Sequence, residues 1–326
     1  MSDDAPLGES PEPVAEEEPS SDPQADRQSP EDSFAVVAND TRLSILRELH
    51  DRVAVADRTE YTVPFTELRE AVGEPDSGKF SYHLNQLLGE FVEKRPEGYA
   101  ILYPGTELVR TVKSGAVGPT EHAVSEPTSA SCYLCGAPVC VAYTYGYVSG
   151  QCTDCRGALG FDYMPEGTLS SIPVPGAAVG DEIEAAPEAL LDRVHGRFCH
   201  RARTFGDGSC PRCGGRTESR IRVCTEHDAS DGPCVECGTT MSATVQVTCE
   251  VCSEGGISPA ACMVSHRAPF REALAAAGVD SLGYDAFAVT AGWTVHVVDG
   301  DEPAVEYDLA AGRVRVVVDG DIRILR

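Results

Sequence analysis

Five pairs of cysteines with the spacing C-x2-C constrain this chain more than any other feature of its sequence. The pairs account for ten of the 14 cysteines in 326 residues. Two thiolates separated by two residues form half of a tetrahedral zinc site, and a second pair completes it. The spacing therefore predicts small modules held together by metal rather than one large apolar core.

The expected compartment agrees with metal binding. The N-terminus has no basic region followed by an apolar segment, as a secretion signal would require, and no apolar run approaches the roughly 18 to 20 residues that span a bilayer. We therefore expect a cytoplasmic protein without membrane contact. That compartment keeps thiols reduced, so the cysteines are interpreted as metal ligands and not as disulfides.

The charge balance is strongly acidic. The chain has 52 Asp and Glu against 26 Lys and Arg, which gives a formal net charge of -26. Such a surface ordinarily repels nucleic-acid phosphates. Acidic residues spread along a chain with few Lys are, however, typical of proteins from a salt-saturated cytosol, where the Debye length is about 3 Å or less. The acidity is therefore interpreted as an adaptation to a high-salt cytosol, and it does not exclude a nucleic-acid partner.

Twelve residues are candidate metal ligands. They are Cys132, Cys135, Cys152, Cys155, Cys210, Cys213, Cys224, His227, Cys234, Cys237, Cys249 and Cys252. The first four are two pairs joined by an alternating, hairpin-like segment, and this arrangement predicts one zinc-ribbon site. Four cysteines lie outside the C-x2-C pairs. Cys224 is one of the candidate ligands, and the other three are expected to be buried apolar residues: Cys140, Cys199 and Cys262.

The remaining eight candidate ligands allow two pairings. The sequential one joins Cys210 and Cys213 with Cys224 and His227, and joins Cys234 and Cys237 with Cys249 and Cys252. The alternative crosses Cys210 and Cys213 with Cys249 and Cys252. Ligands of structural sites are usually close in sequence, so we predict the sequential pairing and about three zinc ions. Closed sites of four ligands leave no position for a catalytic water, so the zinc is expected to be structural.

The fold class predicted from these patterns is a multidomain α+β chain, in which a winged helix-turn-helix precedes tandem zinc ribbons and a small C-terminal antiparallel sheet. The expected segments are a disordered acidic tail (1–32), the helix-turn-helix (33–117), a linker (118–130), the first ribbon (131–180), a helical connector (181–205), the second and third ribbons (206–258) and a helix with a β meander (259–326). The tail has eleven acidic residues against one basic residue, and it has too few large apolar side chains to form a core. In the meander, 287–290 is expected to be a strand.

Residues 33–117 carry helical periodicity followed by a hairpin signal at Pro96-Glu97-Gly98. The order helix, helix, turn, helix, hairpin is that of a winged helix. The segments ANDTRLSILREL and DSGKFSYHLNQLLGEFVEKRPEGYAILYPGTELVRTV resemble ArsR-like regulators. The knuckles, helix and terminal meander that follow resemble an accessory region found behind winged helices in haloarchaeal regulators. The first resemblance implies DNA binding, and the second implies architecture only.

The resemblance implies that the helix beginning near Ser77 enters the major groove while the hairpin touches phosphates. The candidate DNA-binding residues are Ser77, Lys79, Ser81, Tyr82, Asn85 and Gln86 on the helix, with Lys94 and Arg95 on the hairpin. His83 is placed on the same polar face, where it is expected to pack at the helix boundary or to touch a phosphate, without a metal role. A homodimer is expected from the family resemblance and from apolar residues of the first helical segments, including Val36, Val37 and Ile45.

The function expected from the sequence is that of a DNA-binding transcriptional regulator with double-stranded DNA as its partner. An alternative is an adaptor whose zinc ribbons bind proteins of the transcription machinery. A second alternative is a thiol redox or zinc-dependent enzyme. The chain has no H-E-x-x-H helix, phosphate loop or Ser/His/Asp context, so we expect no enzymatic activity and no catalytic residues.

Overall fold

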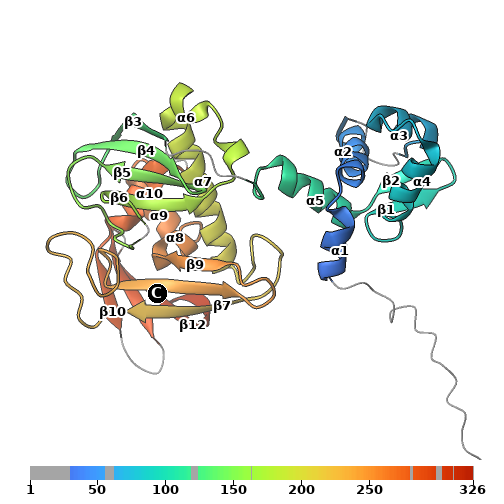
Figure 1. Ribbon diagram of the computed structural model, residues 1–326. Coiled ribbons are helices and arrows are strands. Elements are labelled where there is room, and N and C mark those ends of the chain that lie inside the picture. The colour runs from blue at the N-terminus through green and yellow to red at the C-terminus, as the bar shows by residue number, and fades with distance from the viewer. Residues whose placement is uncertain are drawn as a thin grey trace, which may run out of the picture. The chain divides into compact units, whose positions relative to one another are not determined.

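The computed structural model describes residues 30–55, 62–118, 124–162, 164–279, 282–298, 303–310 and 312–325. The fold is mixed α+β and divides into two compact units, Met1–Arg110 and Thr111–Arg326, called here the N-terminal and C-terminal units (Figure 1). Residues 1–29 of the expected disordered tail (1–32) lie outside the described residues, and residues 30–32 are not disordered, because helix α1 (Pro30–Val37) begins there. Among the helices that the structure describes, none has both the length and the apolar character needed to cross a bilayer.

The N-terminal unit packs helices against a short hairpin. Its elements are α1 (Pro30–Val37), α2 (Asp40–Val55), α3 (Phe65–Val72), α4 (Ser77–Asn85), β1 (Val92–Arg95), β2 (Gly98–Ile101) and α5 (Tyr103–Lys113). Val36, Val37 and Ile45 are buried in the core that these elements share. These three side chains therefore stabilise the unit itself, and they give no support to a dimer.

The connection between α3 and α4 is fixed by local hydrogen bonds. Helix α3 ends at Gly73, whose φ of 76° places it in the left-handed conformation that glycine adopts most easily. Asp76 caps α4, because its carboxylate accepts hydrogen bonds from the backbone N–H of Gly78 at 2.7 Å and of Lys79 at 3.0 Å. Arg69 donates to the carbonyl of Pro75 at 2.7 Å. These contacts set where α4 begins.

The C-terminal unit contains two antiparallel sheets. The four-stranded sheet has the order β3-β4-β5-β6, and the six-stranded sheet has the order β10-β11-β12-β7-β8-β9. The strands are β3 (Val124–Ser131), β4 (Pro138–Thr144), β5 (Tyr147–Cys152), β6 (Thr168–Pro173), β7 (Thr217–Val223), β8 (Ala243–Cys249), β9 (Gly255–Ser258), β10 (Val295–Val298), β11 (Ala304–Leu309) and β12 (Gly312–Leu325). Strand β12 pairs with β7 through Asp319 and Gly320, so the C-terminal meander continues the sheet of the cysteine region.

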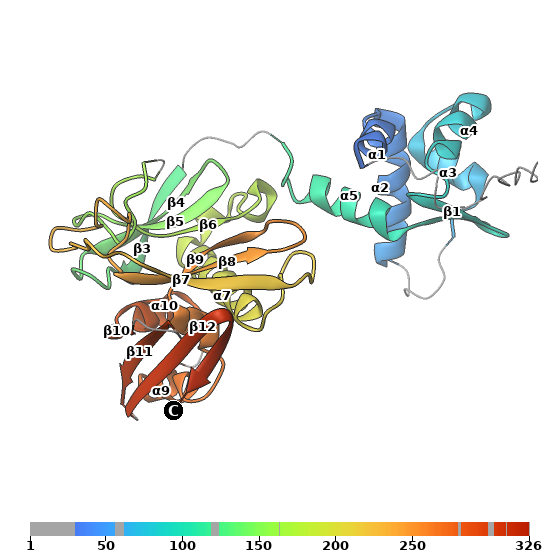
Figure 2. The same cartoon turned by 90° about the horizontal axis from the view of Figure 1, so that it is seen from below.

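Helices lie between the two sheets (Figures 1 and 2). They are α7 (Pro187–Gly206), α8 (Ala260–Val264), α9 (Phe270–Ala276) and α10 (Tyr284–Ala291), with the short η1 (Gly176–Ala178) and α6 (Glu182–Ala185) before them. The first half of α7 buries Leu190 and Leu191 in the core of the four-stranded sheet. Its second half buries Ala202 and Phe205 in the core of the six-stranded sheet. Helix α7 thus belongs to both cores and joins them.

Three sequence-based expectations differ from this architecture. Part of the expected linker 118–130 is strand β3, in which half-buried and exposed positions alternate and which pairs with β4. The expected strand at 287–290 lies in helix α10, because Tyr284 and Phe287 both face buried clusters that a helix brings together. The segments set apart between 131 and 326 form one compact unit.

Candidate metal centres

Three clusters, each of four Cys or His side chains, bring all twelve candidate ligands together. Site 1 is Cys132, Cys135, Cys152 and Cys155; site 2 is Cys210, Cys213, Cys249 and Cys252; site 3 is Cys224, His227, Cys234 and Cys237. In each site the four ligand atoms lie within 4.8 Å of one another. The expected ligand set is therefore assembled, and each set could hold one metal ion.

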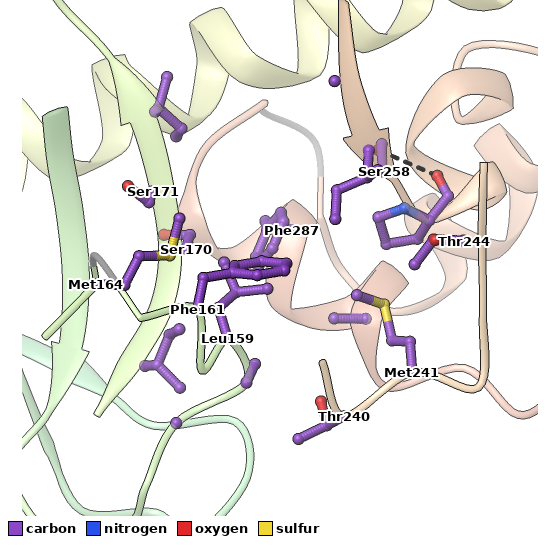
Figure 3. Close-up of a pocket in the computed structure, with 18 of the residues that line it drawn as sticks. Leu159, Phe161, Met164, Ser170, Ser171, Thr240, Met241, Thr244, Ser258 and Phe287 are labelled. Carbon is purple, nitrogen blue, oxygen red and sulfur yellow. Dashed lines mark hydrogen bonds between the residues drawn. The ribbon is translucent and has the colours of Figure 1, made fainter. Parts of the chain in front are cut away.

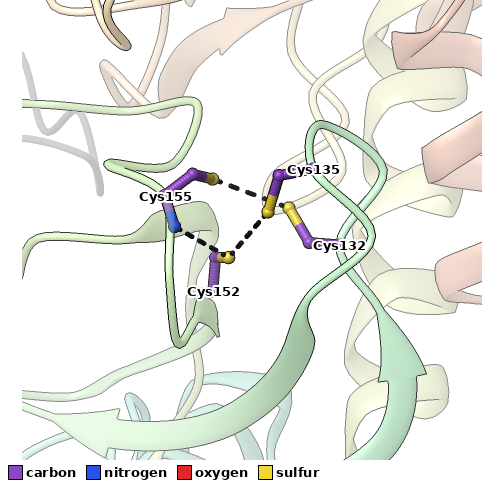
Figure 4. Close-up of side chains that lie close together, drawn as sticks. All are labelled: Cys132, Cys135, Cys152 and Cys155. Atoms are coloured by element: carbon purple, nitrogen blue, oxygen red, sulfur yellow. Dashed lines mark hydrogen bonds between the residues drawn. The ribbon is translucent and has the colours of Figure 1, made fainter.

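Site 1 follows the predicted pairing (Figure 4). The Sγ atoms of Cys132 and Cys155 are 3.8 Å apart, and those of Cys135 and Cys152 are 3.5 Å apart. Strands β4 and β5 pair Val139 with Cys152, which places the knuckle before β4 beside the knuckle after β5. The hairpin between the cysteine pairs is thus what closes this site.

Site 2 corrects the predicted pairing. Cys210 lies 3.7 Å from Cys252 and Cys213 lies 3.6 Å from Cys249, measured between Sγ atoms. The reason is the antiparallel pairing of β7 with β8, whose register sets Thr217 opposite Cys249. The crossed arrangement is therefore correct, and the sequential one is wrong.

Site 3 lies within the connection between β7 and β8, so it is nested inside site 2. Cys224 follows β7 directly, and its backbone N–H donates to the carbonyl of Ser242 at 2.9 Å, next to the start of β8. The Sγ of Cys237 lies 3.5 Å from the Nδ1 of His227. The crossed pairing leaves no knuckle without a partner, because the inner ligands close on one another.

The knuckles share a tight turn that aims backbone N–H groups at sulfur. The N–H of Leu134 donates to the Sγ of Cys132, and that of Val251 donates to the Sγ of Cys249, each at 3.4 Å. Gly136 follows its knuckle with a φ of 80°, and its N–H donates to the carbonyl of Cys132 at 2.8 Å. Hydrogen bonds of this kind stabilise a thiolate over a thiol, which is the form that binds metal.

The electrostatics within each site also favour a cation. In site 1, burial raises the pKa of Cys155 to about 12, whereas N–H groups of Asp154 and Cys155 outweigh burial and lower the pKa of Cys152 to about 7. In site 2, the sulfur neighbours of Cys213 outweigh the N–H of Gly215 and raise its pKa to about 12. Four thiols this close cannot all ionise without a positive charge among them, and a bound divalent ion supplies that charge.

The distances fit a tetrahedral metal ion. Four sulfurs at about 2.3 Å from one ion lie roughly 3.8 Å apart, and a nitrogen at about 2.0 Å lies roughly 3.5 Å from each sulfur. The four S–S distances given above for sites 1 and 2 are 3.5 to 3.8 Å, the distance from the Sγ of Cys237 to the Nδ1 of His227 in site 3 is 3.5 Å, and all other ligand atoms of a site lie within 4.8 Å of one another. The residues present therefore fit a tetrahedral ion with four thiolates in two sites and three thiolates with one imidazole in the third.

The nested pairing can be tested by removing one knuckle. In the double variant Cys234→Ser with Cys237→Ser, we expect site 3 to be lost and two all-sulfur sites to remain, because sites 1 and 2 use neither residue. Optical spectra of the cobalt-loaded protein separate all-sulfur ligand sets from sets with one nitrogen. A persisting signal from a site with one nitrogen would instead support the sequential pairing, in which His227 shares its site with Cys210, Cys213 and Cys224.

The other three cysteines lie outside these clusters. Cys199 and Cys262 are buried as expected, whereas the expectation is wrong for Cys140, which is only half-buried on β4. Burial raises the pKa of Cys199 to about 12 and that of Cys262 to about 11. Both thiols are therefore protonated at neutral pH, as expected of cysteines that act as small apolar residues.

The residues expected to contact DNA lie on one helix and one hairpin of the N-terminal unit. Ser77, Lys79, Tyr82, Asn85 and Gln86 are exposed on or directly after α4, and Ser81 is half-buried. Lys94 and Arg95 are exposed on β1. The placement of His83 on the polar face is wrong: it is buried, because the turn of α4 points it into the unit beside Phe80 and Leu84.

A buried pair that the sequence analysis missed joins β6 to α7. The Oγ of Ser170 lies 2.8 Å from the Nε2 of His195, and the Nδ1 of His195 lies 2.8 Å from the carbonyl oxygen of Leu191. A carbonyl only accepts, so Nδ1 carries the proton and Ser170 donates to Nε2. The two residues are 25 positions apart. No local pattern in the sequence relates them.

Burial lowers the pKa of His195 to about 4, against the ordinary value of 6.5. The unfolded chain therefore binds the proton first, and stability is lost as the pH falls from about 6.5 to about 4. The loss attributable to this side chain is about 3 kcal/mol. We expect chemical unfolding of the metal-loaded protein to show this loss of unfolding free energy as the pH falls. The variant His195→Gln should lose about 3 kcal/mol less than the wild type over the same pH range. Parallel pH profiles for the two proteins would contradict the assignment.

Comparisons with known proteins give two family matches. Residues 30–112 match a family described as a domain of unknown function (DUF7347), and residues 129–324 match one described as a domain of unknown function (DUF7351). No curated protein matches the chain. The second match covers all three metal sites, helices α7 to α10 and both sheets except the first five residues of β3 and the last residue of β12. Because it spans more than half of the sequence, the chain belongs to the DUF7351 family.

Proposed function

We propose that the protein is a DNA-binding transcriptional regulator whose N-terminal unit is an ArsR-like winged helix. The observation that carries the proposal is the exposed polar face of α4, next in sequence to the two-stranded hairpin β1–β2. In winged helices the corresponding helix enters the major groove, and the hairpin lies on the backbone. The cap at Asp76 fixes the first turn of α4, which is where base contacts are made in this mode of binding.

Two of the cationic side chains proposed to contact DNA already form ion pairs with neighbouring carboxylates. Lys79 Nζ lies 2.8 Å from Glu74, and Arg95 Nε lies 2.9 Å from Glu93. The hydrogen bond from Lys79 lowers the pKa of Glu74, so this carboxylate stays ionised. DNA phosphates would have to replace these carboxylates as partners. We therefore propose binding that depends on direct hydrogen bonds more than on net charge, as the high salt of the proposed cytosol would require.

We propose further that the three clusters hold zinc in a structural role. Thiolates with imidazole in tetrahedral geometry suit Zn²⁺ better than the harder divalent ions, and a nitrogen ligand in site 3 disfavours a cubane iron–sulfur cluster there. Four protein ligands fill the coordination shell. Zinc would supply no catalytic water in such sites and would instead hold the surrounding loops in place. Assembly as a homodimer is proposed from the family resemblance alone.

The proposal is tested by genome-wide occupancy of the full chain at native salt, followed by gel shift on the enriched fragments. A regulator gives discrete sites with a shared motif, and a dimer gives a motif with two-fold symmetry. An adaptor that contacts only proteins would give no complex with the purified fragments. That result would reject DNA reading by α4 and favour the adaptor instead.

A further inference from the structure

The C-terminal unit contains a large cleft that is bordered by the metal sites and has no part in the proposed DNA-binding face. Its volume is about 1230 Å³, and it lies between residues of the four-stranded sheet, helix α7 and strands β8 and β9 (Figure 3). Sites for small molecules in proteins have volumes of about 300 to 1,000 Å³ and occur preferentially where substructures meet. The cleft is therefore large enough for an organic ligand of several rings.

The walls are apolar and adaptable. Leu159, Phe161 and Phe287 face the cleft, as Figure 3 shows, together with the thioethers of Met164 and Met241. Met263 also lines it, so every methionine of the chain except Met1 lies at the cleft. Methionine side chains adjust to ligands of different shape and are frequent at such surfaces. An apolar ligand in the cleft would contact both flexible thioethers and aromatic rings.

Three of the four charged residues along the cleft, Arg156, Arg201 and Asp231, form ion pairs within the protein, and the fourth, Asp154, is exposed in the turn between Cys152 and Cys155. Arg156 lies 3.6 Å from Glu166 and 3.7 Å from Asp231, and Arg201 forms an ion pair with Glu254. Arg201 also lies over the ring of Phe205, 5.9 Å from its centroid. An anionic ligand would have to break these pairs to find a cationic partner, and among the described residues that line the cleft no charged group is left for a ligand apart from Asp154 at its exposed edge. The cleft therefore favours a molecule without net charge.

Hydroxyl groups supply the polar contacts. Ser170, Ser171, Thr240, Thr244 and Ser258 are labelled along the cleft in Figure 3. The hydroxyl of Ser170 is oriented by His195, to which it donates, so its oxygen keeps lone pairs that can accept. A neutral histidine fixed by a backbone carbonyl holds this hydroxyl in one orientation. Such a fixed acceptor suits a ligand with an N–H or O–H donor.

We propose that this cleft binds an uncharged, largely apolar small organic molecule that carries a hydrogen-bond donor. The ligating residues Cys135 and Cys155 of site 1 line the cleft, as do Ser253 beside Cys252 and Thr240 near Cys237. All three metal sites therefore hold loops that form its walls. Binding at this cleft does not depend on whether the N-terminal unit binds DNA.

The test uses N-phenyl-1-naphthylamine, an uncharged aromatic amine with one N–H donor, and the metal-loaded full chain. We expect saturable fluorescence enhancement with one probe per chain. The variants Ser171→Trp and Thr240→Trp fill the cleft and should weaken binding by about tenfold or more. Ser125→Trp is the matched control, because Ser125 is exposed on β3, at the opposite edge of the same sheet from β6, and does not line the cleft.

A second measurement needs no substitution. In protein labelled at the methionine methyl groups, saturating probe should shift the resonances of Met164 and Met241 and leave that of Met1 unchanged. No saturable binding, equal affinity in the filled and control variants, or binding that moves neither methionine resonance would each overturn the proposal. If a tryptophan variant loses its metal, its titration is set aside and the methionine resonances of the wild-type chain decide the test.

Discussion

Removing the bound metal with a strong chelator is expected to unfold the C-terminal unit, Thr111–Arg326. Cys132 and Cys152 belong to the core of the four-stranded sheet, and Cys210 and Cys249 belong to the core of the six-stranded sheet. Structural zinc contributes about 10 to 16 kcal/mol of apparent binding free energy per site in small modules. Whole domains are stable by only about 5 to 15 kcal/mol, so losing the contributions of both sites 1 and 2, which lie in these cores, removes more than the fold retains.

Single substitutions should separate the sites by their effect on stability. Cys249→Ser removes a buried ligand on β8, which pairs with both β7 and β9, so we expect loss of the six-stranded sheet together with one equivalent of metal. Cys237→Ser affects site 3, which lies on a connection outside both sheets, and should lower the melting temperature much less.

The control for these variants is Cys140→Ser, which changes a half-buried cysteine that lies in no site. Metal content by elemental analysis and near-ultraviolet circular dichroism, measured on the same samples, report binding and packing together. A chelated protein that keeps its near-ultraviolet spectrum and its melting temperature would show that the metal does not hold the cores together.

The composition of the metal sites could be predicted from sequence, but their pairing could not. The C-x2-C spacing alone identifies which residues are ligands, because two residues are what a knuckle turn needs. Which knuckles meet depends on the register of β7 with β8, where Thr217 faces Cys249 across 32 residues of chain. A preference for local ligands fails here because the β7–β8 hairpin brings its two ends together and leaves the inner ligands at its tip.

Other differences have the same origin in long-range packing. The segment at 287–290 alternates in a way that suits a strand, yet Tyr284 and Phe287 lie one helical turn apart in α10. Both rings contact His195, whose ring centroid is 5.1 Å from that of Tyr284 and 5.3 Å from that of Phe287. His83 is polar by type but lies on the inward side of α4. The pair of Ser170 with His195 and the cleft beside it arise from elements that only the tertiary fold brings together.

The double variant Lys79→Gln with Asn85→Ala is expected to abolish sequence-specific DNA binding. Both side chains are exposed on α4, where a groove-entering helix would present them to base edges and phosphates. Contacts of this kind are worth about 1 to 3 kcal/mol each, so their joint loss weakens specific binding by about thirtyfold or more, which removes the specific complex at protein concentrations near the wild-type Kd. Glutamine at position 79 can still donate to Glu74, which protects the start of the helix.

The matched control is Arg110→Gln on α5. Lys79 and Arg110 each have a side chain that is 58% exposed, and each forms an ion pair with a nearby glutamate. The two substitutions remove the same charge from the same unit, but only one removes it from the proposed reading face. Gel shift on the enriched fragments should therefore show full binding by Arg110→Gln and none by the double variant. Equal losses would mean that charge alone governs binding, and unchanged binding by the double variant would reject α4 as the recognition helix.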